Sequence, residues 1–325
     1  MAPASYSRSM SSPLPENNHI AEPLLEVSRA RPLLGTLVQI RASGPAFRIH
    51  SAVDAGFTAI EQLHHRLSYH DPQSELSALN HQVLFEPRRV HADTYAVLFA
   101  ALHFARLSEG AFDPCVGFDL ERWGLLPGDS STRAPGALGS WRDIELLPEQ
   151  RVCIHRPLRI DLGGIAKGYA VDLAVQALAS SGAVDILVNA GGDLRVAGAR
   201  GRAIALRHPS APQRSSESVT LLNAALATSA AYYSRTQGSD GEVSALLNPA
   251  DRAPHLDPGS VSVRAANCMS ADALTKVVLF APPRVAERAL AACDAMAFIQ
   301  QPHTERSIGY ARHSPAHLGV AAHAH

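Results

Sequence analysis

The sequence lacks an uninterrupted apolar run of about 18 residues, the length expected of a membrane-spanning helix. It also lacks an excess of either charge, since 29 Lys and Arg residues stand against 30 Asp and Glu residues, for a net charge of −1. Proteins that bind nucleic acids normally carry a basic excess or stripe, so this balance argues against that class. The 325 residues, 46% of them hydrophobic, suffice for one full-sized core or for two subdomains that share a cleft.

Cysteine is scarce, and its positions are isolated from one another. Cys115, Cys153, Cys268 and Cys293 form no C-x-x-C pair, which argues against a structural zinc site and a redox dithiol. Four cysteines in a chain of this length also argue against a disulfide framework. Residues 1–30 show no basic segment followed by an apolar run, so no signal peptide is recognisable and we expect a cytoplasmic protein.

The two ends of the chain differ in composition from its middle. Residues 1–28 are rich in Ser, Pro and Asn and are expected to be disordered, and residues 302–325 are expected to form a flexible His-rich tail. One folded domain is then expected over residues 29–301.

The apolar pattern of this middle part predicts a mixture of helices and strands. Ser74, Asp93 and Ser270 are the expected N-caps. Helices are expected over residues 52–67, 75–80, 93–107, 165–180, 271–280 and 284–292. Strands are expected over residues 34–41, 144–147, 151–155, 158–162, 185–189, 194–197, 203–207, 219–222, 261–264 and 297–300.

A glycine pair lies where the strand expected at 158–162 leads into the helix expected at 165–180. Gly163 and Gly164 would leave backbone N–H groups open near a positive helix terminus, which suits an anion such as phosphate. The dinucleotide motif G-x-G-x-x-G is absent, and Tyr169–Ala170 stands where a P-loop has Lys-Ser/Thr. The residues alone therefore leave two interpretations open, a phosphate site and a purely structural turn.

The most specific pattern consists of two glycine-containing segments, DLGGIAKGYA at 161–170 and LVNAGGDL at 187–194. They closely resemble the signature of the FAD:protein FMN transferase (ApbE) family. Further segments that resemble this family follow its order along the chain, from about residue 31 to residue 300: Arg31–Thr36, Leu67–Asn80, Gly110–Pro114, Ala227–Ser229, Ser260–Arg264 and Ser270–Thr275.

This resemblance implies an α+β fold of the ApbE (tandem T-fold-like) type, with an active cleft between two halves. It also implies an activity: FMN is moved from FAD to a Thr or Ser hydroxyl of an acceptor protein, and AMP is released. Phosphoryl transfer requires positioning, charge neutralisation and a base, and Mg²⁺ is the expected source of positive charge. Neither nucleic acid nor a membrane span is expected.

The resemblance also implies site residues, carried over position by position. For Mg²⁺ they are the Gly164 carbonyl, Asp272 and Thr275. For FAD they are Leu34, His70, Ala111, Phe112, Asp113, Asp161, Lys167 and Leu247. Structural alternatives exist for the charged members, because aspartates also cap turns and a helix lysine is often solvated.

Two positions depart from the family's pattern. Ala245 stands where the family usually has a His, and alanine cannot accept a proton, so the catalytic residue stays unassigned. Lys276 stands four residues after Asp272, where the family often has a Thr that binds the metal. Either Lys276 points away and Thr275 substitutes, or Lys276 supplies part of the cation's charge. An FAD-binding protein without transferase activity, for storage or sensing, is the alternative function.

Overall fold

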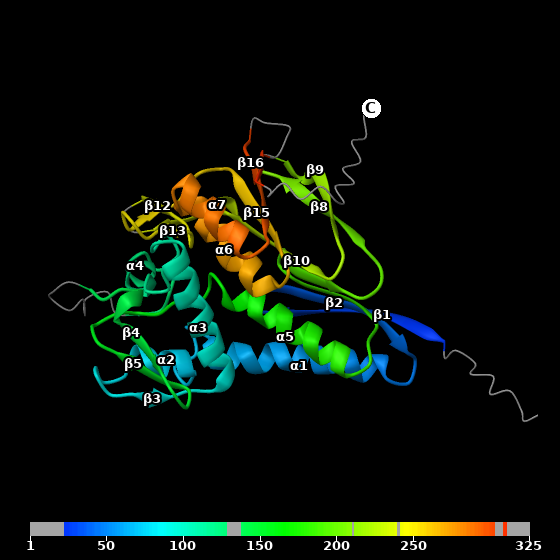
Figure 1. The fold of residues 1–325 in the computed structure, drawn as a ribbon, viewed down its shortest axis with the longest axis horizontal. Coiled ribbons are helices and arrows are strands. Elements are labelled where there is room, and N and C mark those ends of the chain that lie inside the picture. The colour runs from blue at the N-terminus through cyan, green and yellow to red at the C-terminus, as the bar shows by residue number, and fades with distance from the viewer. Residues whose placement is uncertain (1–22, 129–137, 210, 239–240, 303–307, 311–325) are drawn as a thin grey trace, which may run out of the picture.

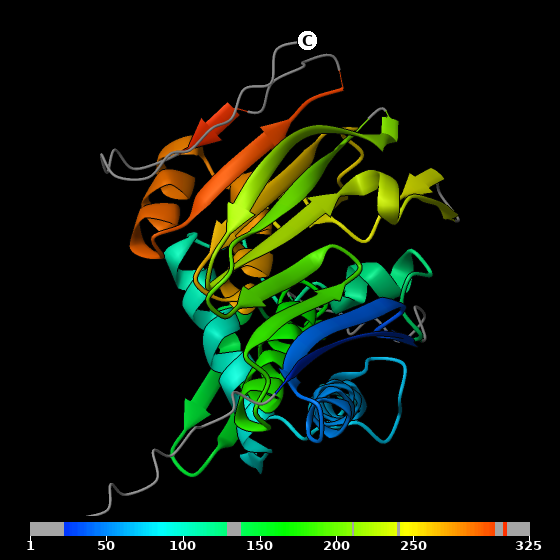
Figure 2. The same cartoon turned by 90° about the vertical axis from the view of Figure 1, so that its right-hand side faces the viewer.

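An eight-stranded antiparallel sheet forms the centre of the fold (Figures 1 and 2). The computed structural model describes residues 23–128, 138–209, 211–238, 241–302 and 308–310. In spatial order the strands are β1 (Leu24–Leu33), β2 (Thr36–Pro45), β6 (Asp185–Ala190), β7 (Asp193–Ala197), β10 (Ala224–Ala230), β15 (Ser260–Ala265), β16 (Met296–Gln300) and β17 (Ile308–Tyr310). With its helices this sheet confirms the expected α+β class.

Three helices lie side by side on one face of the sheet (Figure 1). They are α1 (Ile49–Leu67), which packs on β1 and β2, α5 (Ala166–Ser180), on β6 and β7, and α6 (Cys268–Phe280), on β10 and β15. A fourth helix, α7 (Pro283–Ala292), packs on α6. The ribbon of β8 (Arg202–His208) and β9 (Ala211–Leu221) covers the opposite face, where Leu206 and Leu221 pack with Leu194 and Leu226.

Smaller elements complete the fold. α3 (Ala92–Leu107) contacts both α1 and α6, and the strands β3, β5 and β4 form a separate sheet. The bounds of the remaining elements are α2 (Glu75–Asn80), β3 (Arg88–Arg89), α4 (Gly117–Arg122), a 3-10 turn at Trp141–Asp143, β4 (Ile144–Leu147), β5 (Arg151–Ile154), a 3-10 turn at Ala231–Tyr233, β11 (Thr236–Gly238), β12 (Gly241–Val243), β13 (Leu247–Asn248) and β14 (Ala253–Pro254).

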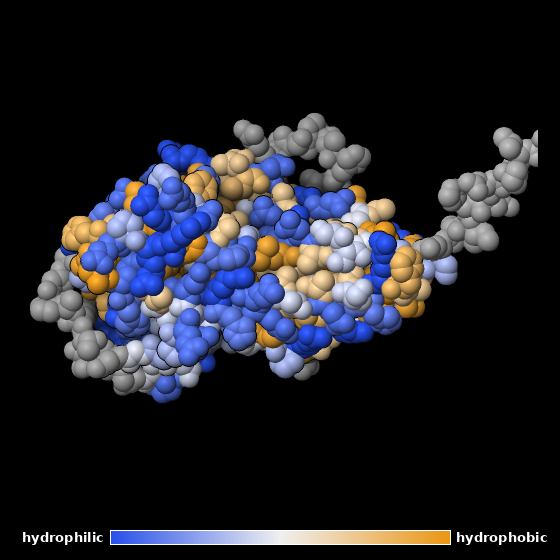
Figure 3. Space-filling model, turned by 90° about the horizontal axis from the view of Figure 1, so that it is seen from below, coloured by the Kyte–Doolittle hydropathy of each residue, from blue (hydrophilic) through white to orange (hydrophobic). Residues whose placement is uncertain are grey.

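α1 shows how apolar spacing forms the core beneath the sheet. Its residues Ile49, Val53, Phe57, Ile60 and Leu63 recur every three or four positions and are buried. The outer side of the molecule seen from below is mostly hydrophilic, with hydrophobic side chains in scattered areas (Figure 3). Among the described residues, no helix combines the length and apolar content needed to cross a bilayer.

The contact between α5 and α6 sets the geometry of the site. Gly168 lies so close to α6 that an added Cβ would stand 2.3 Å from the Cys268 carbonyl oxygen. The carboxylate of Asp172 accepts hydrogen bonds from the Cys268 and Met269 amides at 2.9 and 2.8 Å, which satisfies two free donors at the start of α6. The beginning of α6 is therefore fixed against α5 by both close packing and hydrogen bonds.

We expect Gly168→Ala to destabilise the protein by about 1–3 kcal/mol, because backbone atoms of α6 must move to admit the methyl group. The better helix propensity of Ala, about 1 kcal/mol, offsets only part of this cost. Gly164→Ala is the control, since the atoms nearest to a Cβ there lie at 3.5 Å, an ordinary van der Waals distance. Urea unfolding measures both, and a Gly168→Ala protein as stable as the wild type would contradict the close contact.

The strand expected at 158–162 is wrong. This segment forms no strand, because its backbone bonds to loops and to a side chain instead of a neighbouring strand. The Ile160 amide donates to Asn80 Oδ1 at 2.7 Å, and Asn80 Nδ2 donates to the Ile160 carbonyl at 2.9 Å. The Asp161 amide donates to the Pro114 carbonyl at 2.8 Å. Partners distant in the sequence thus replace the ladder that the apolar pattern suggested.

The start of the fold also differs from expectation. β1 begins at Leu24, so the last part of the segment expected to be disordered, up to residue 28, is a strand, while residues 1–22 lie outside the described part. The single strand expected at 34–41 is β2, which begins at Thr36, because Leu34 and Gly35 form the turn between β1 and β2 with φ of +55° and +69°. β17 lies within the expected tail, most of which is not described.

One of the three expected N-caps is confirmed. Ser74 caps α2 as expected, since its hydroxyl accepts the Ser77 amide at 3.0 Å. The expected caps Asp93 and Ser270 are wrong: His91 caps α3 and Asn267 caps α6. In each case the true cap accepts a hydrogen bond from the amide of the residue that was predicted to be the cap.

Candidate functional site

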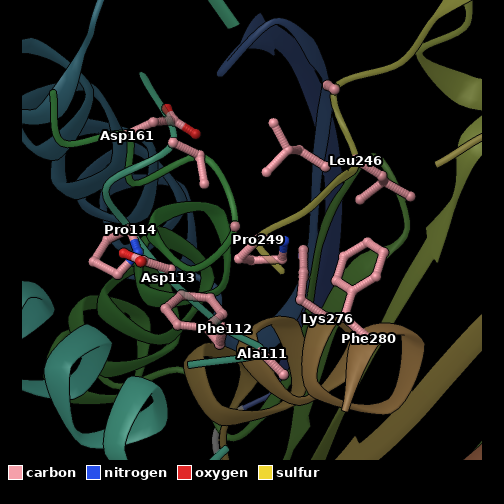
Figure 4. Close-up of a pocket in the computed structure, with 13 residues that line it drawn as sticks. Ala111, Phe112, Asp113, Pro114, Asp161, Leu246, Pro249, Lys276 and Phe280 are labelled. Atoms are coloured by element: carbon pink, nitrogen blue, oxygen red, sulfur yellow. The ribbon is translucent and has the colours of Figure 1, made fainter. Parts of the chain in front are cut away.

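A cavity opens between α6, the Asp161–Gly164 turn, the loop after α3 and the segment that leads into β13 (Figure 4). Lys276 and Phe280 reach it from α6, and Phe112 and Asp113 from the opposite loop. Its wall consists of Ala111, Phe112, Asp113, Pro114, Val116, Asp161, Gly164, Ala245, Leu246, Leu247, Pro249, Lys276 and Phe280. Segments far apart in the sequence therefore meet at one hollow of mixed apolar and charged character.

Most of the residues expected to contact FAD lie in this wall, namely Ala111, Phe112, Asp113, Asp161 and Leu247, together with Gly164 from the expected metal set. Leu34 and His70 are outside it: Leu34 is in the β1–β2 turn, and His70 is an exposed residue after α1. Lys167, Asp272 and Thr275 are also outside the wall, but α5 and α6 hold them close to Lys276.

Four charged side chains adjoin the cavity, one in the first turn of α5, two in the middle of α6 and one at the start of β7. We call Lys167, Asp193, Asp272 and Lys276 the Asp272 cluster. Lys167 Nζ lies 2.6 Å from Asp193 Oδ2 and 3.8 Å from Asp272 Oδ2, and Lys276 Nζ contacts Asp272 Oδ1. The Gly168 amide donates to Asp272 Oδ2 at 3.2 Å. Donors thus reach both oxygens of a carboxylate that is only 1% exposed.

Opposite charges offset the cost of burial at Asp272 and Lys167. Burial alone would raise the pKa of Asp272, but Lys167 and Lys276 lower it below its usual value. Burial likewise opposes the charge of Lys167, yet Asp193 and Asp272 raise its pKa. The cluster therefore holds two ammonium groups against two carboxyl groups, and only Lys276 among them belongs to the cavity wall.

Two further carboxyl groups face the cavity itself. Burial raises the pKa of Asp161, an effect that the Gly163 amide, Lys167, Lys276 and His70 only partly oppose. Burial also raises the pKa of Asp113, although the Cys115 amide and Arg252 act to lower it. Carboxyl groups with raised pKa values in a cavity are candidates for general acid–base work.

The glycine turn uses much of its hydrogen-bonding capacity within the protein. The Gly163 amide donates to Asp161 Oδ1 at 3.2 Å, and the Ala166 amide donates to the Leu162 carbonyl at 2.8 Å. Gly164 differs, because it forms part of the cavity wall and a Cβ there would stand 3.5 Å from both Lys276 Cε and Phe112 Cε2. Its missing side chain keeps the space between these two side chains open.

The expected Mg²⁺ ligands do not fit a divalent ion as they lie. Lys276 Nζ contacts Asp272 Oδ1 and the Asp272 carbonyl oxygen, the latter at 3.1 Å. Thr275 is fully buried, and its hydroxyl bonds to the Asp272 carbonyl and to Ser229 Oγ, each at 2.7 Å. An ammonium about 4 Å from a cation is repelled by about 4 kcal/mol per unit charge at an intermediate dielectric. Lys276 therefore stands where an ion bound to Asp272 would need to be.

Asp193 is not among the site residues expected from the sequence, although it occurs in the segment LVNAGGDL. Its carboxylate binds Lys167 and accepts the Thr228 amide at 3.3 Å. An acidic residue directly after a Gly-Gly turn was the available signal. Phe280 and Pro249 were missed as well, and apolar residues of this kind carry no chemical signal in one sequence. Ala245, the departure from the family's His, does lie in the wall.

Comparisons with known proteins show the family of this chain. The model of the ApbE family matches residues 34–299. An FAD:protein FMN transferase from Treponema pallidum is 30% identical over 278 residues, covering 77% of each chain. One from Vibrio cholerae is 29% identical over 229 residues, covering 66% of this chain and 69% of that protein.

Solved structures show the same fold. The flavin transferase ApbE from Vibrio cholerae superposes with a TM-score of 0.71 at 25% identity, covering 90% of this chain and 98% of that chain. The ApbE protein from Thermotoga maritima superposes with a TM-score of 0.69 at 26% identity, covering 85% and 94%.

Proposed function

The chain belongs to the ApbE family, and we propose that it is an FAD:protein FMN transferase that modifies a Thr or Ser hydroxyl of an acceptor protein. One observation carries the proposal: the family match spans a cavity whose wall contains five of the eight residues expected to contact FAD. The names of the relatives support the same activity.

The reaction joins the acceptor oxygen to the phosphorus of the FMN half of FAD. The P–O bond between the two phosphoryl groups breaks, AMP leaves with the bridging oxygen, and the hydroxyl proton passes to a base. Lys276 is the wall residue whose charge suits the pyrophosphate, and Lys167 lies behind it. Positioning and charge neutralisation are the main requirements of such a transfer.

We assign the base to Asp161. The family's usual His is Ala245 here, so the titratable groups of the wall that can accept a proton are the carboxyl groups of Asp113 and Asp161. Asp161 lies within the electrostatic reach of both lysines, whereas Arg252 is the cation that acts on Asp113. The phosphates are expected beside the lysines, so Asp161 is the carboxylate closer to the reaction. Mg²⁺, which the resemblance implies, enters no step because its expected ligands do not fit it.

Acceptor-dependent AMP release tests the proposal. The protein is incubated with FAD and with an acceptor that the Vibrio cholerae relative flavinylates, and that relative serves as the positive control. We expect AMP to form only with the acceptor, and not with an acceptor variant in which the modified Thr is replaced by Val. AMP formation that ignores the acceptor would indicate simple hydrolysis of FAD and contradict transfer.

A further inference from the structure

Lysine is almost absent from this protein, and its placement is uneven. Lys167 and Lys276 are the only lysines among 29 Lys and Arg residues, and both contact the carboxylate of Asp272. All other basic positions of that count are arginines, including those that bind carboxylates at the surface, such as Arg29 and Arg31. A compact ammonium is a point charge, whereas a guanidinium is a wide planar fork. The site thus contains both lysines of the protein, whose compact ammonium groups are closer in size to a small metal ion than a guanidinium is.

Lys276 holds the position of a bound cation. Its Nζ contacts two oxygens of one residue, the Oδ1 and the carbonyl of Asp272, and its side chain is only 14% exposed. An ammonium has three donors, so two contacts with Asp272 leave one for a group in the cavity. Gly164 lies beside the lysine stem, and its lack of a side chain gives that group access.

We propose that the Lys276 ammonium replaces a divalent cation in this site, so that the cavity binds the pyrophosphate of FAD without Mg²⁺. Only the identity of the nucleotide rests on the proposed function; the exclusion of a metal ion from Asp272 follows from the side chains themselves. The hypothesis combines three features: the ammonium on Asp272, its place in the cavity wall, and the enclosure of the Thr275 hydroxyl by Ser229 and the Asp272 carbonyl.

The charges of the cluster predict the effect of removing Lys276. With both lysines the cluster contains two positive and two negative side chains, Asp193 and Asp272 being the latter. Without Lys276 it would carry an excess negative charge beside the phosphates, and Asp272 Oδ1 would be free for a metal ion. Lys276→Thr adds a hydroxyl at the place where the family resemblance implies one, whereas Lys276→Met removes the charge and offers no oxygen.

FAD titrations followed by flavin fluorescence, in EDTA and in Mg²⁺, test the proposal on these three proteins. The wild-type dissociation constant should agree within about twofold between the two conditions. In EDTA both variants should bind FAD at least about tenfold more weakly, which corresponds to about 1.4 kcal/mol. Mg²⁺ should restore binding by Lys276→Thr and leave Lys276→Met weak. A wild-type affinity that falls severalfold in EDTA would overturn the proposal.

Thermal unfolding with Mg²⁺ and no nucleotide gives a second measurement that does not depend on FAD. Ligands that bind only the native state raise its melting temperature. We expect Mg²⁺ to raise the melting temperature of Lys276→Thr and to leave wild type and Lys276→Met unchanged. A rise for the wild type equal to that of Lys276→Thr would overturn the exclusion of the metal. If the wild type bound no FAD in either condition, the proposed function would fail, and this second measurement would still decide the role of Lys276.

Discussion

Gly164→Val should weaken FAD binding by about a hundredfold or more, or about 2.7 kcal/mol, in a protein that remains folded. A Cβ at this position would already touch Lys276 Cε and Phe112 Cε2 at 3.5 Å. The two additional methyl groups of Val must therefore enter the cavity or displace one of these wall residues. Either outcome removes the space in which we expect the phosphates to contact Lys276.

Gly164→Ala is the matched control, because its single methyl group makes only ordinary contacts. We expect it to retain FAD affinity within a fewfold and to unfold at the wild-type temperature. Calorimetric titration of FAD into both variants measures the difference. Equal affinities for the wild type and Gly164→Val would show that the nucleotide does not approach this turn, and would refute the placement of the phosphates.

Asp161→Asn should reduce the rate of FMN transfer by about 10²–10⁴-fold, the range for loss of a general base, while FAD affinity changes little. Asn has nearly the same shape and can still accept the hydrogen bond from the Gly163 amide, but it cannot accept the acceptor's proton. Asp113→Asn is the control, and should leave the rate within about tenfold of wild type. Comparable losses in the two variants would contradict the assignment of the base to Asp161.

The pH profile of transfer provides an independent check. A base acts when it is deprotonated, and burial raises the pKa of Asp161 above the ordinary value of 3.8. The wild-type rate should therefore fall as the pH decreases through this raised pKa, at a pH where an exposed aspartate would still be ionised. The residual rate of Asp161→Asn should lack this acid limb. Persistence of the limb in Asp161→Asn would assign it to another group.

Local signals predicted elements that depend mainly on their own sequence. α1 followed from its apolar spacing, and α2 from its Ser cap. The central strand β10, AALATSA, was missed because alanine has a low strand propensity. Burial between β7 and β15 decides its structure: Ala225 and Ala227 pack toward the helices, while Ala224 and Leu226 pack toward the β8–β9 ribbon. Such closely packed neighbours are not visible in a single sequence.

The site could be predicted in part for a similar reason. The family resemblance selected Gly164 and Asp161, which lie in one cavity wall, and the four-residue spacing of Asp272 and Lys276 allowed their ion pair. Only the structure shows that the Lys276 side chain points at Asp272 and not away from it. The hydrogen bond between the Thr275 hydroxyl and Ser229 on β10 also joins elements that are distant in the sequence. It occupies the hydroxyl that was expected to bind the metal ion.

The intact mass of the acceptor, measured after incubation with this protein and FAD in EDTA, tests the central claim most directly. We predict that the acceptor gains the mass of one FMN, that its Thr→Val variant gains none, and that added Mg²⁺ changes the yield little. An acceptor that keeps its original mass with and without Mg²⁺, while the Vibrio cholerae relative modifies it in parallel, would contradict the account.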